Sequence, residues 1–239
     1  LMDQLRSGKK CTNIITIIIK NMRNNFFNAN EAFEYLYHYI RDYGEDFATT
    51  RAIFNCGFYL DRPAEKLITA KKRDWKHEYA EAEWQWYLSG DPSIKKLGEL
   101  YGKIPAIWKR MADENGNVRS NYGWQWQRNH QIDYVINKLK SNKVTRHAAI
   151  SIYDGKEHGT YEFDTPCTYA VQFTILHDKL NMSVYMRSND LWYGFCNDQY
   201  CFSRLQLLVA DELEIRLGTY FHFAHNLHLY NNIIDKINE

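Results

Sequence analysis

The chain has 239 residues, of which 45% are hydrophobic, and a formal net charge of +1 at pH 7. This length predicts one large domain, 1–239, with a poorly defined N-terminal extension over residues 1–30. The balanced, interspersed charge argues against a dedicated nucleic-acid binder, because such proteins carry a basic stripe. The longest apolar run near the N-terminus, residues 14–19, is too short to span a membrane.

The cysteine and histidine pattern predicts a reduced, metal-free protein. The cysteines form an odd set without metal-ligand spacing or a disulfide framework: Cys11, Cys56, Cys167, Cys196 and Cys201. His222 and His228 share one face of a predicted strand but lie roughly 20 Å apart, so one ion does not join them. We therefore expect a cytoplasmic protein and no metal site.

The first half of the chain is predicted to be mostly helical. Asn28 begins the cap of a helix over residues 31–43, and a strand follows at residues 52–60. Hydrophobic spacing and stop signals predict further helices over residues 76–88, 93–101, 105–111 and 131–139. A polar loop occupies residues 112–117.

From Arg146 the hydrophobic period changes from 3.6 to 2, which predicts strands. These strands cover residues 148–153, 169–176, 182–186 and 218–230, with a hairpin turn at residues 177–179 and an amphipathic helix at 202–214. Helices first and a sheet-rich second half predict an α+β fold or a mixed-sheet α/β fold.

Residues 185–200 form the most informative stretch. A strand delivers Arg187 and Ser188 at its end, and a glycine-containing turn then leads to Asn197 and Asp198 at the start of a helix. An arginine at a strand end and a polar helix N-terminus suit a phosphorylated small molecule.

Cys167 follows Pro166 where a strand is predicted to begin. A free cysteine is more often a small buried residue than a nucleophile, and that alternative stays open on position alone. A nucleophilic role requires a nearby cation that favours the thiolate. Arg187, on the next strand of the hairpin, is the candidate for that cation.

Glu83 lies in the aromatic helix segment 83–87. Neighbouring tryptophans would partly remove its carboxylate from water, which raises the pKa and suits proton transfer. The alternative is a solvated helix face that Glu83 shares with Lys76 and Glu81.

Taken together, the motifs resemble the thymidylate synthase superfamily, and within it the deoxycytidylate hydroxymethylase branch. The resemblance spans about residues 45–232 and depends on Ile107-Trp108, residues 112–116, Tyr122-Gly123, Pro166-Cys167, Arg187-Ser188-Asn189-Asp190 and His228-Leu229-Tyr230. It implies a mixed β-sheet flanked by helices and a homodimer whose sheets pack back to back.

The resemblance also implies a reaction on a pyrimidine nucleoside monophosphate. Cys167 adds to C6 of the ring, and C5 then attacks the one-carbon group of 5,10-methylenetetrahydrofolate. Glu83 organises water and proton transfers, and Tyr122 lies near the nucleophile. Further implied contacts are to phosphate (Arg187, Ser188 and, from the partner subunit, Arg146), folate (Trp108, Asp190, Gly194) and sugar (His228, Tyr230).

The choice of base depends on Asp198, eleven positions after Arg187. Thymidylate synthases carry Asn there, whereas the cytidylate hydroxymethylases carry Asp. A carboxyl group accepts from the cytosine amine and, when protonated, donates to N3. Each wrongly paired buried group costs roughly 1–3 kcal/mol. Alternatively, Asp198 is only a helix N-cap and Asn197 reads uracil.

Three departures from the family pattern concern the phosphate site and the tail. His147 replaces the second arginine of the pair that begins at Arg146, and the N-terminal phosphate loop has no clear arginine, so Arg51 or Arg41 is expected to substitute. The chain ends nine residues after Tyr230. A missing tail would leave the site wetter and favour water over hydride as the final reactant.

The sequence therefore predicts a dCMP hydroxymethylase of the kind that phages use to modify DNA precursors in the host cytoplasm. Two uracil-directed enzymes, a thymidylate synthase and a dUMP hydroxymethylase, fit the same motifs if Asn197 reads the base. The motifs are also compatible with a CMP hydroxymethylase and with a non-catalytic relative that binds nucleotides or RNA.

Overall fold

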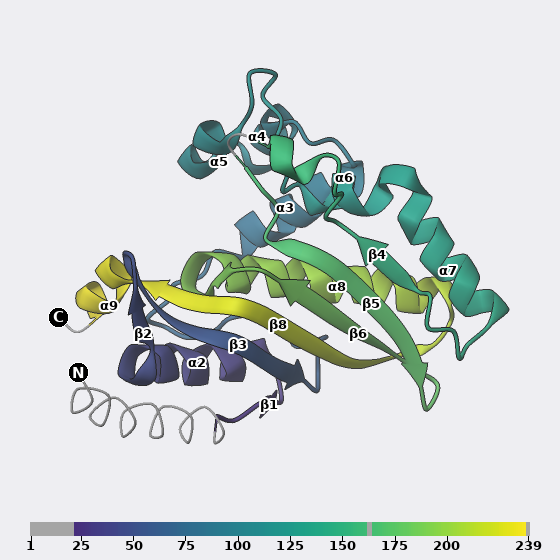
Figure 1. The fold of residues 1–239 in the computed structure, drawn as a ribbon, viewed down its shortest axis with the longest axis horizontal. Helices are drawn as coiled ribbons and strands as arrows, with labels where there is room; N and C mark the ends of the chain where they lie inside the picture. The colour runs from purple at the N-terminus through teal and green to yellow at the C-terminus, as the bar shows by residue number, and fades with distance from the viewer. Residues whose placement is uncertain (1–21, 162–163, 238–239) are drawn as a thin grey trace, which may run out of the picture.

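The computed structural model describes residues 22–161 and 164–237, and within them it has one mixed β-sheet flanked by helices (Figure 1). Residues 1–21 of the predicted extension, including Cys11, lie outside the described residues. The strands are β1 Asn25–Phe26, β2 Glu45–Phe47, β3 Thr50–Leu60, β4 Ala149–Ser151, β5 Thr168–Leu176, β6 Lys179–Met186, β7 Asn189–Asp190 and β8 Arg216–Tyr230. This architecture confirms the predicted fold class.

Two helices, α2 and α8, pack on one face of the sheet, and the other face is not covered by a described helix (Figure 1). The sheet order is β1-β3-β8-β6-β5-β4, with β8 antiparallel to β3 and parallel to β6. The helices are α2 Ala29–Tyr43, α3 His77–Ser89, α4 Ile94–Tyr101, α5 Ala106–Met111, α6 Tyr122–Gln127, α7 Gln131–Ser141, α8 Cys196–Glu212 and α9 Asn231–Ile237. None of these described helices combines the length and apolar character that crossing a membrane requires.

Local sequence signals explain the two best predicted elements. Helix α2 begins where the Asn28 side chain accepts a hydrogen bond from the Glu31 N–H, as an N-cap residue does. The β5–β6 hairpin turns at His177 and Asp178, whose φ angles of 51° and 54° are those of a two-residue type I′ turn. The cap and the turn are both confirmed.

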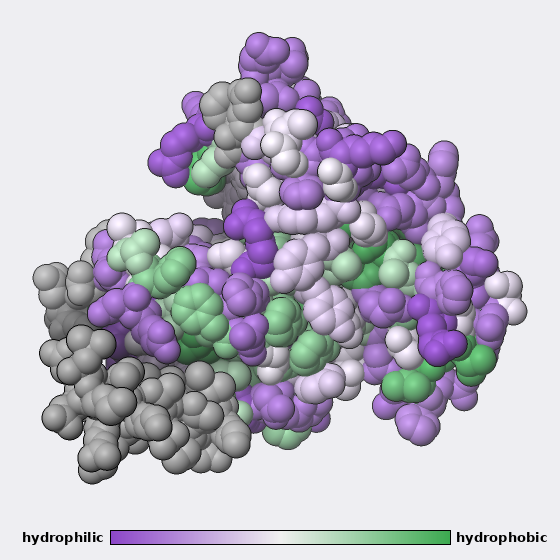
Figure 2. Space-filling model, viewed as in Figure 1, coloured by the Kyte–Doolittle hydropathy of each residue, from purple (hydrophilic) through white to green (hydrophobic). Residues whose placement is uncertain are grey.

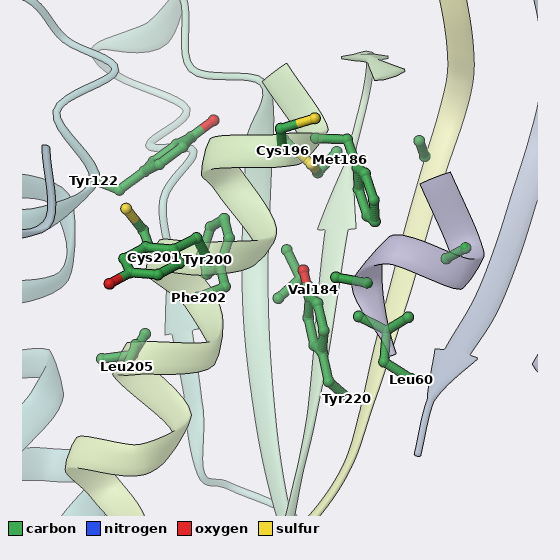
Figure 3. Close-up of a cluster of buried hydrophobic side chains, with 14 of the residues drawn as sticks. Leu60, Tyr122, Val184, Met186, Cys196, Tyr200, Cys201, Phe202, Leu205 and Tyr220 are labelled. Carbon is green, nitrogen blue, oxygen red and sulfur yellow. The ribbon is translucent and has the colours of Figure 1, made fainter. Parts of the chain in front are cut away.

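The core lies between α8 and the sheet (Figure 3). Helix and sheet contribute buried side chains to it, including Cys201, Phe202, Leu205, Val184, Met186 and Tyr220. Each large apolar side chain buried here stabilises the fold by roughly 1.5–3 kcal/mol. Helix α8 is thereby fixed against β6 and β8.

The structure differs from the predicted elements in several places, and the short strands β1, β2 and β7 are among the elements that were not predicted. The strand predicted at 148–153 is shorter, because the Ile152 carbonyl leaves the ladder and accepts from the Arg128 guanidinium at 2.7 Å. Helix α8 starts six residues before the predicted position 202, directly after a π-helical turn at Leu191–Phe195. Helices α6 and α9 were not predicted.

Candidate active site

The candidate nucleophile Cys167 lies immediately before β5 and is held by Arg187. The Arg187 backbone N–H donates to the Cys167 carbonyl at 2.7 Å. The Arg187 guanidinium donates to the carbonyls of Thr165 at 2.8 Å and Pro166 at 3.2 Å. Arg187 therefore fixes the Pro-Cys corner, and the hairpin brings the two residues together as expected.

Although Arg187 is close, it does not lower the pKa of the Cys167 thiol below its usual value. The pKa of Cys167 is raised to about 11, mainly by burial and also by the negative charges of Asp198, Asp164 and Asp190, although Arg187 acts in the opposite direction. The cation expected from the sequence is present, but it does not outweigh burial and three acids. The thiol is therefore protonated at neutral pH.

Glu83 is a buried carboxyl on α3, with only 4% of its surface exposed. The Tyr79 hydroxyl donates to Glu83 Oε1 at 3.1 Å, and the Trp108 indole N–H donates to the Tyr79 hydroxyl at 2.7 Å. Burial, together with the charge of Asp198, raises the pKa of Glu83 to about 8. The solvated alternative for Glu83 is wrong, and a carboxyl with this pKa is suited to proton transfer at neutral pH.

Asp198 lies in the first turn of α8, and its Oδ2 accepts from the Asn189 side-chain amide at 2.7 Å. Burial raises the pKa of Asp198 to about 7. Its negative charge raises the pKa values of Cys167, Glu83 and Tyr122, so the Asp198 carboxyl lies among these groups. The helix N-cap alternative is wrong, because Asp198 lies within α8.

Asn197 has different surroundings from those of Asp198. Its Oδ1 accepts from the Trp75 indole N–H at 2.8 Å, and its Nδ2 donates to the Tyr193 carbonyl at 3.2 Å. Both ends of this side-chain amide are therefore engaged by groups on the side of Trp75 and Tyr193.

Tyr122 begins α6 and is almost completely buried beside the start of β5 (Figure 3). Its hydroxyl accepts from the Thr168 backbone N–H at 3.3 Å, one residue after Cys167. Burial raises its pKa well above the usual value, and the charges of Asp198 and Cys167 act in the same direction. Its hydroxyl is therefore neutral at physiological pH and available as a donor.

His228 and Tyr230 lie on β8 with their ring centroids 5.4 Å apart. Burial raises the pKa of Tyr230, and the charges of Asp190 and Cys167 raise it too, so these two side chains lie towards the Cys167 end of the site. His228 Nδ1 is 2.8 Å from Asn226 Oδ1. Ser188 follows Arg187 between β6 and β7.

Arg146 is not brought to Cys167 within one chain. It is exposed before β4 and lines a shallow hollow together with Lys143, Gln172 and Thr174. The two arginines expected to substitute in the phosphate loop serve local structure: Arg51 donates to the Gly44 carbonyl at 2.7 Å, and Arg41 pairs with Asp42 at 2.7 Å. No group of three metal-ligating side chains occurs in the described ranges.

Sequence reasoning missed three side chains at this site. Tyr79 precedes Glu83 by one helical turn, so its place on the same face of α3 was available from the spacing. Asn189 and His222 lie 33 residues apart and meet through a hydrogen bond of 3.1 Å. Their contact depends on the pairing of β7 with β8, which no local pattern revealed.

Comparison with known proteins places this geometry in a family. The family model described as "Thymidylate synthase" matches residues 41–239. Thymidylate synthase 1 of Bacillus amyloliquefaciens is 27% identical over 187 residues, covering 74% of this chain and 79% of the relative. Thymidylate synthase 1 of Bacillus subtilis (strain 168) is 26% identical over 199 residues, covering 80% of this chain and 70% of the relative.

The protein is thus a one-carbon transferase with a mixed α/β fold. The chain belongs to the thymidylate synthase family. Members of this family act on a pyrimidine nucleotide and use 5,10-methylenetetrahydrofolate as co-substrate.

The residues expected to contact the folate suit a flat, polar ring. Trp108 is half-buried, so part of its indole is open to a stacking partner, and its N–H is already bonded to Tyr79. Burial raises the pKa of Asp190 to about 6. A Cβ at Gly194 would lie 2.9 Å from Asn189 Nδ2 and 3.3 Å from Asp198 Oδ2, so a side chain there would press on this pair.

Proposed function

We propose that the protein is a homodimeric hydroxymethylase that converts dCMP, 5,10-methylenetetrahydrofolate and water to 5-hydroxymethyl-dCMP and tetrahydrofolate. The observation that carries the proposal is Asp198, whose pKa is raised by burial to about 7. A carboxyl with this pKa carries a proton in a large share of molecules at neutral pH. It then offers one donor to cytosine N3 and one acceptor to the cytosine amine.

The proposed roles of the other side chains follow from their chemistry. Cys167 Sγ loses its proton and bonds to C6 of cytosine, and this bond breaks again when the product forms. Glu83 accepts and returns protons and orients the attacking water, for which its pKa of about 8 is suitable. The folate, held by Trp108, Asp190 and Gly194, supplies the one-carbon group.

The nucleotide contacts are also part of the proposal. Arg187 and Ser188 bind the phosphate, His228 and Tyr230 hold the sugar, and Tyr122 donates its hydroxyl near the nucleophile. Support comes from the position of Arg187 at the Cys167 corner and from the effect of the Cys167 charge on Tyr230.

We further propose that two chains pair through the open face of the sheet. Support comes from aromatic side chains on this face, which Figure 2 views from the front. Tyr59 is 43% exposed and packs on Phe221, and Tyr185 packs on Phe221 and Phe223. Such a dimer would also bring Arg146 of one chain to the phosphate of the other.

A single domain over 1–239 and a cytoplasmic, phage-encoded enzyme stay predictions.

The decisive experiment measures tritium release from C5-labelled dCMP, CMP and dUMP with 5,10-methylenetetrahydrofolate, followed by mass analysis of the product. We expect release from dCMP and a product that carries a hydroxymethyl group. Release from dUMP alone would refute the cytosine proposal, and a methylated product would identify hydride as the final reactant. Cys167→Ala should abolish release; turnover near the wild-type rate would exclude the covalent mechanism.

A further inference from the structure

A buried network of hydrogen-bonded polar side chains extends from Asp198 into the core. Asn189 Nδ2 lies 2.7 Å from Asp198 Oδ2, and Asn189 Oδ1 lies 3.1 Å from His222 Nε2. His222 Nδ1 lies 2.8 Å from the Tyr220 hydroxyl. Asn189 is 3% exposed, and His222 and Tyr220 are completely buried. Most polar groups so deep in a core have a hydrogen-bond partner.

The hydrogen bonds in this network all donate in the direction from Tyr220 towards Asp198. Burial lowers the pKa of His222 to about 3, so its ring is neutral and has one donor and one acceptor. The Asn189 amide nitrogen donates to Asp198, so Asn189 Oδ1 is left to accept from His222 Nε2–H, and His222 Nδ1 then accepts from the Tyr220 hydroxyl. His222 and Tyr220 thereby hold the Asn189 amide in this orientation.

We propose that Asn189 is a specificity-determining positioning residue that fixes Asp198 Oδ2 as a hydrogen-bond acceptor and confines the carboxyl proton to Oδ1. A protonated carboxyl otherwise carries its proton on either oxygen. A proton on Oδ2 would face the Asn189 N–H, and two donors would oppose each other. Asp198 therefore presents a donor and an acceptor in one fixed order, as an amide does, and cytosine needs one fixed order.

The role in specificity rests on the proposed function, which is cytosine recognition. The positioning of Asp198 by Asn189 is testable without any substrate. Gly194 supports it independently, because the absence of a Cβ there leaves the Asn189–Asp198 pair its space. Other ionisable groups interact electrostatically with Asp198, namely Glu83, Tyr87, Tyr122, Cys167, Asp190, Cys196, Cys201 and Tyr220. A readout specific to the Asp198 carboxyl is therefore required.

The first test is Asn189→Leu, which keeps the approximate shape and removes both hydrogen bonds. We expect the ratio of kcat/KM for dCMP to that for dUMP to fall about 5- to 10-fold, the equivalent of one lost hydrogen bond. The pKa of Asp198, read from the carboxyl resonance in ¹³C NMR, should rise by about one pH unit, because the Asn189 N–H no longer favours the carboxylate.

Variants at His222 distinguish its effect on the orientation of the Asn189 amide from its effect on core packing. His222→Leu removes the donor to Asn189 and should lower the dCMP to dUMP ratio, whereas His222→Gln keeps an N–H donor and should restore it. Gln206→Leu is the matched control, because Gln206 is also buried on α8 and donates to the carbonyls of Leu180 and Thr219 away from Asp198. It should lower stability without changing the ratio or the pKa of Asp198.

An unchanged ratio and an unchanged Asp198 pKa in folded Asn189→Leu would overturn the proposal, as would an equal change in Gln206→Leu. If the wild type prefers dUMP, the proposed function fails, but the NMR comparison still decides whether Asn189 positions Asp198. The two failures are thus distinguishable in one set of proteins.

Discussion

Replacing Glu83 by glutamine should make the folded protein more stable at alkaline pH while it removes activity. Burial raises the pKa of Glu83 from 4.5 to about 8 in the folded protein. The folded state therefore binds the proton more tightly than the unfolded chain does. As the pH rises from about 4.5 to 8, the free energy of unfolding falls, because unfolding then releases a proton.

The size of this effect follows from the two pKa values. One pH unit corresponds to about 1.4 kcal/mol, so a carboxyl raised from 4.5 to about 8 destabilises the fold by about 4–5 kcal/mol above pH 8. Part of the increase arises from the charge of Asp198, which shares the site. We therefore expect Glu83→Gln to be more stable than the wild type by about 2–4 kcal/mol at pH 9, and by less than about 1 kcal/mol at pH 5.

Urea unfolding followed by tryptophan fluorescence measures this difference at pH 5, 7 and 9. Protein concentration must be equal in all samples, because a dimer makes apparent stability depend on concentration. The control is Glu114→Gln in the exposed polar loop, which should follow the wild type at each pH. A Glu83→Gln stability difference that is the same at pH 5 and 9, or a wild type that gains stability over this range, would refute the reasoning.

Three further variants test other parts of the site. Tyr79→Phe removes a donor to Glu83 and should lower kcat about tenfold with little change in KM; an unchanged pH–rate profile would show that Tyr79 does not act through Glu83. Arg187→Gln should raise the pH midpoint for iodoacetamide labelling of Cys167, measured by mass spectrometry of its peptide, because the cation lowers this pKa. Gly123→Ala would drive a Cβ into the Tyr87 backbone carbonyl on α3, and urea unfolding should show a loss of about 1–3 kcal/mol or more.

The parts of the fold predicted from the sequence are those fixed by local chemistry. Three features depend only on residues close in sequence: the helix cap at Asn28, the two-residue turn at His177 and Asp178, and the alternation of side-chain polarity in β5 and β6. Helix α6 was missed because it is held by long-range contacts, including the close approach of Gly123 to α3, whereas α5, which has the same length, follows the start signal Pro105. Short helices lack the periodicity that identifies longer ones.

The contact between two site residues on one hairpin could be predicted from the sequence. The pKa of the thiol could not, because it depends on charges from several parts of the fold. Cys167 and Arg187 were expected together because adjacent strands carry them, and they are in contact. The thiol pKa of about 11 depends on burial and on Asp198, Asp164 and Asp190, which come from three separate segments. No sequence pattern sums such contributions.

The surroundings of Asn197 and Asp198 could not be predicted without knowing the residue at which α8 begins. Consecutive residues of an α-helix point about 100° apart, so only one of the two can face a given group. The helix begins at Cys196, which directs Asn197 to Trp75 and Asp198 to Asn189. The Trp75 contact joins positions 122 residues apart, and no turn chemistry near residue 197 indicates it.

The proposed base recognition and the activation of the nucleophile are linked through one proton. The negative charge of Asp198 raises the pKa of Cys167, so a protonated Asp198 removes one obstacle to the thiolate. Cytosine needs Asp198 protonated, because its N3 accepts a hydrogen bond. Uracil instead donates from N3–H and favours the ionised carboxylate, which keeps Cys167 protonated. A uracil nucleotide would therefore be disfavoured twice: its O4 would oppose an acceptor oxygen of Asp198, and the ionised carboxylate would raise the pKa of Cys167.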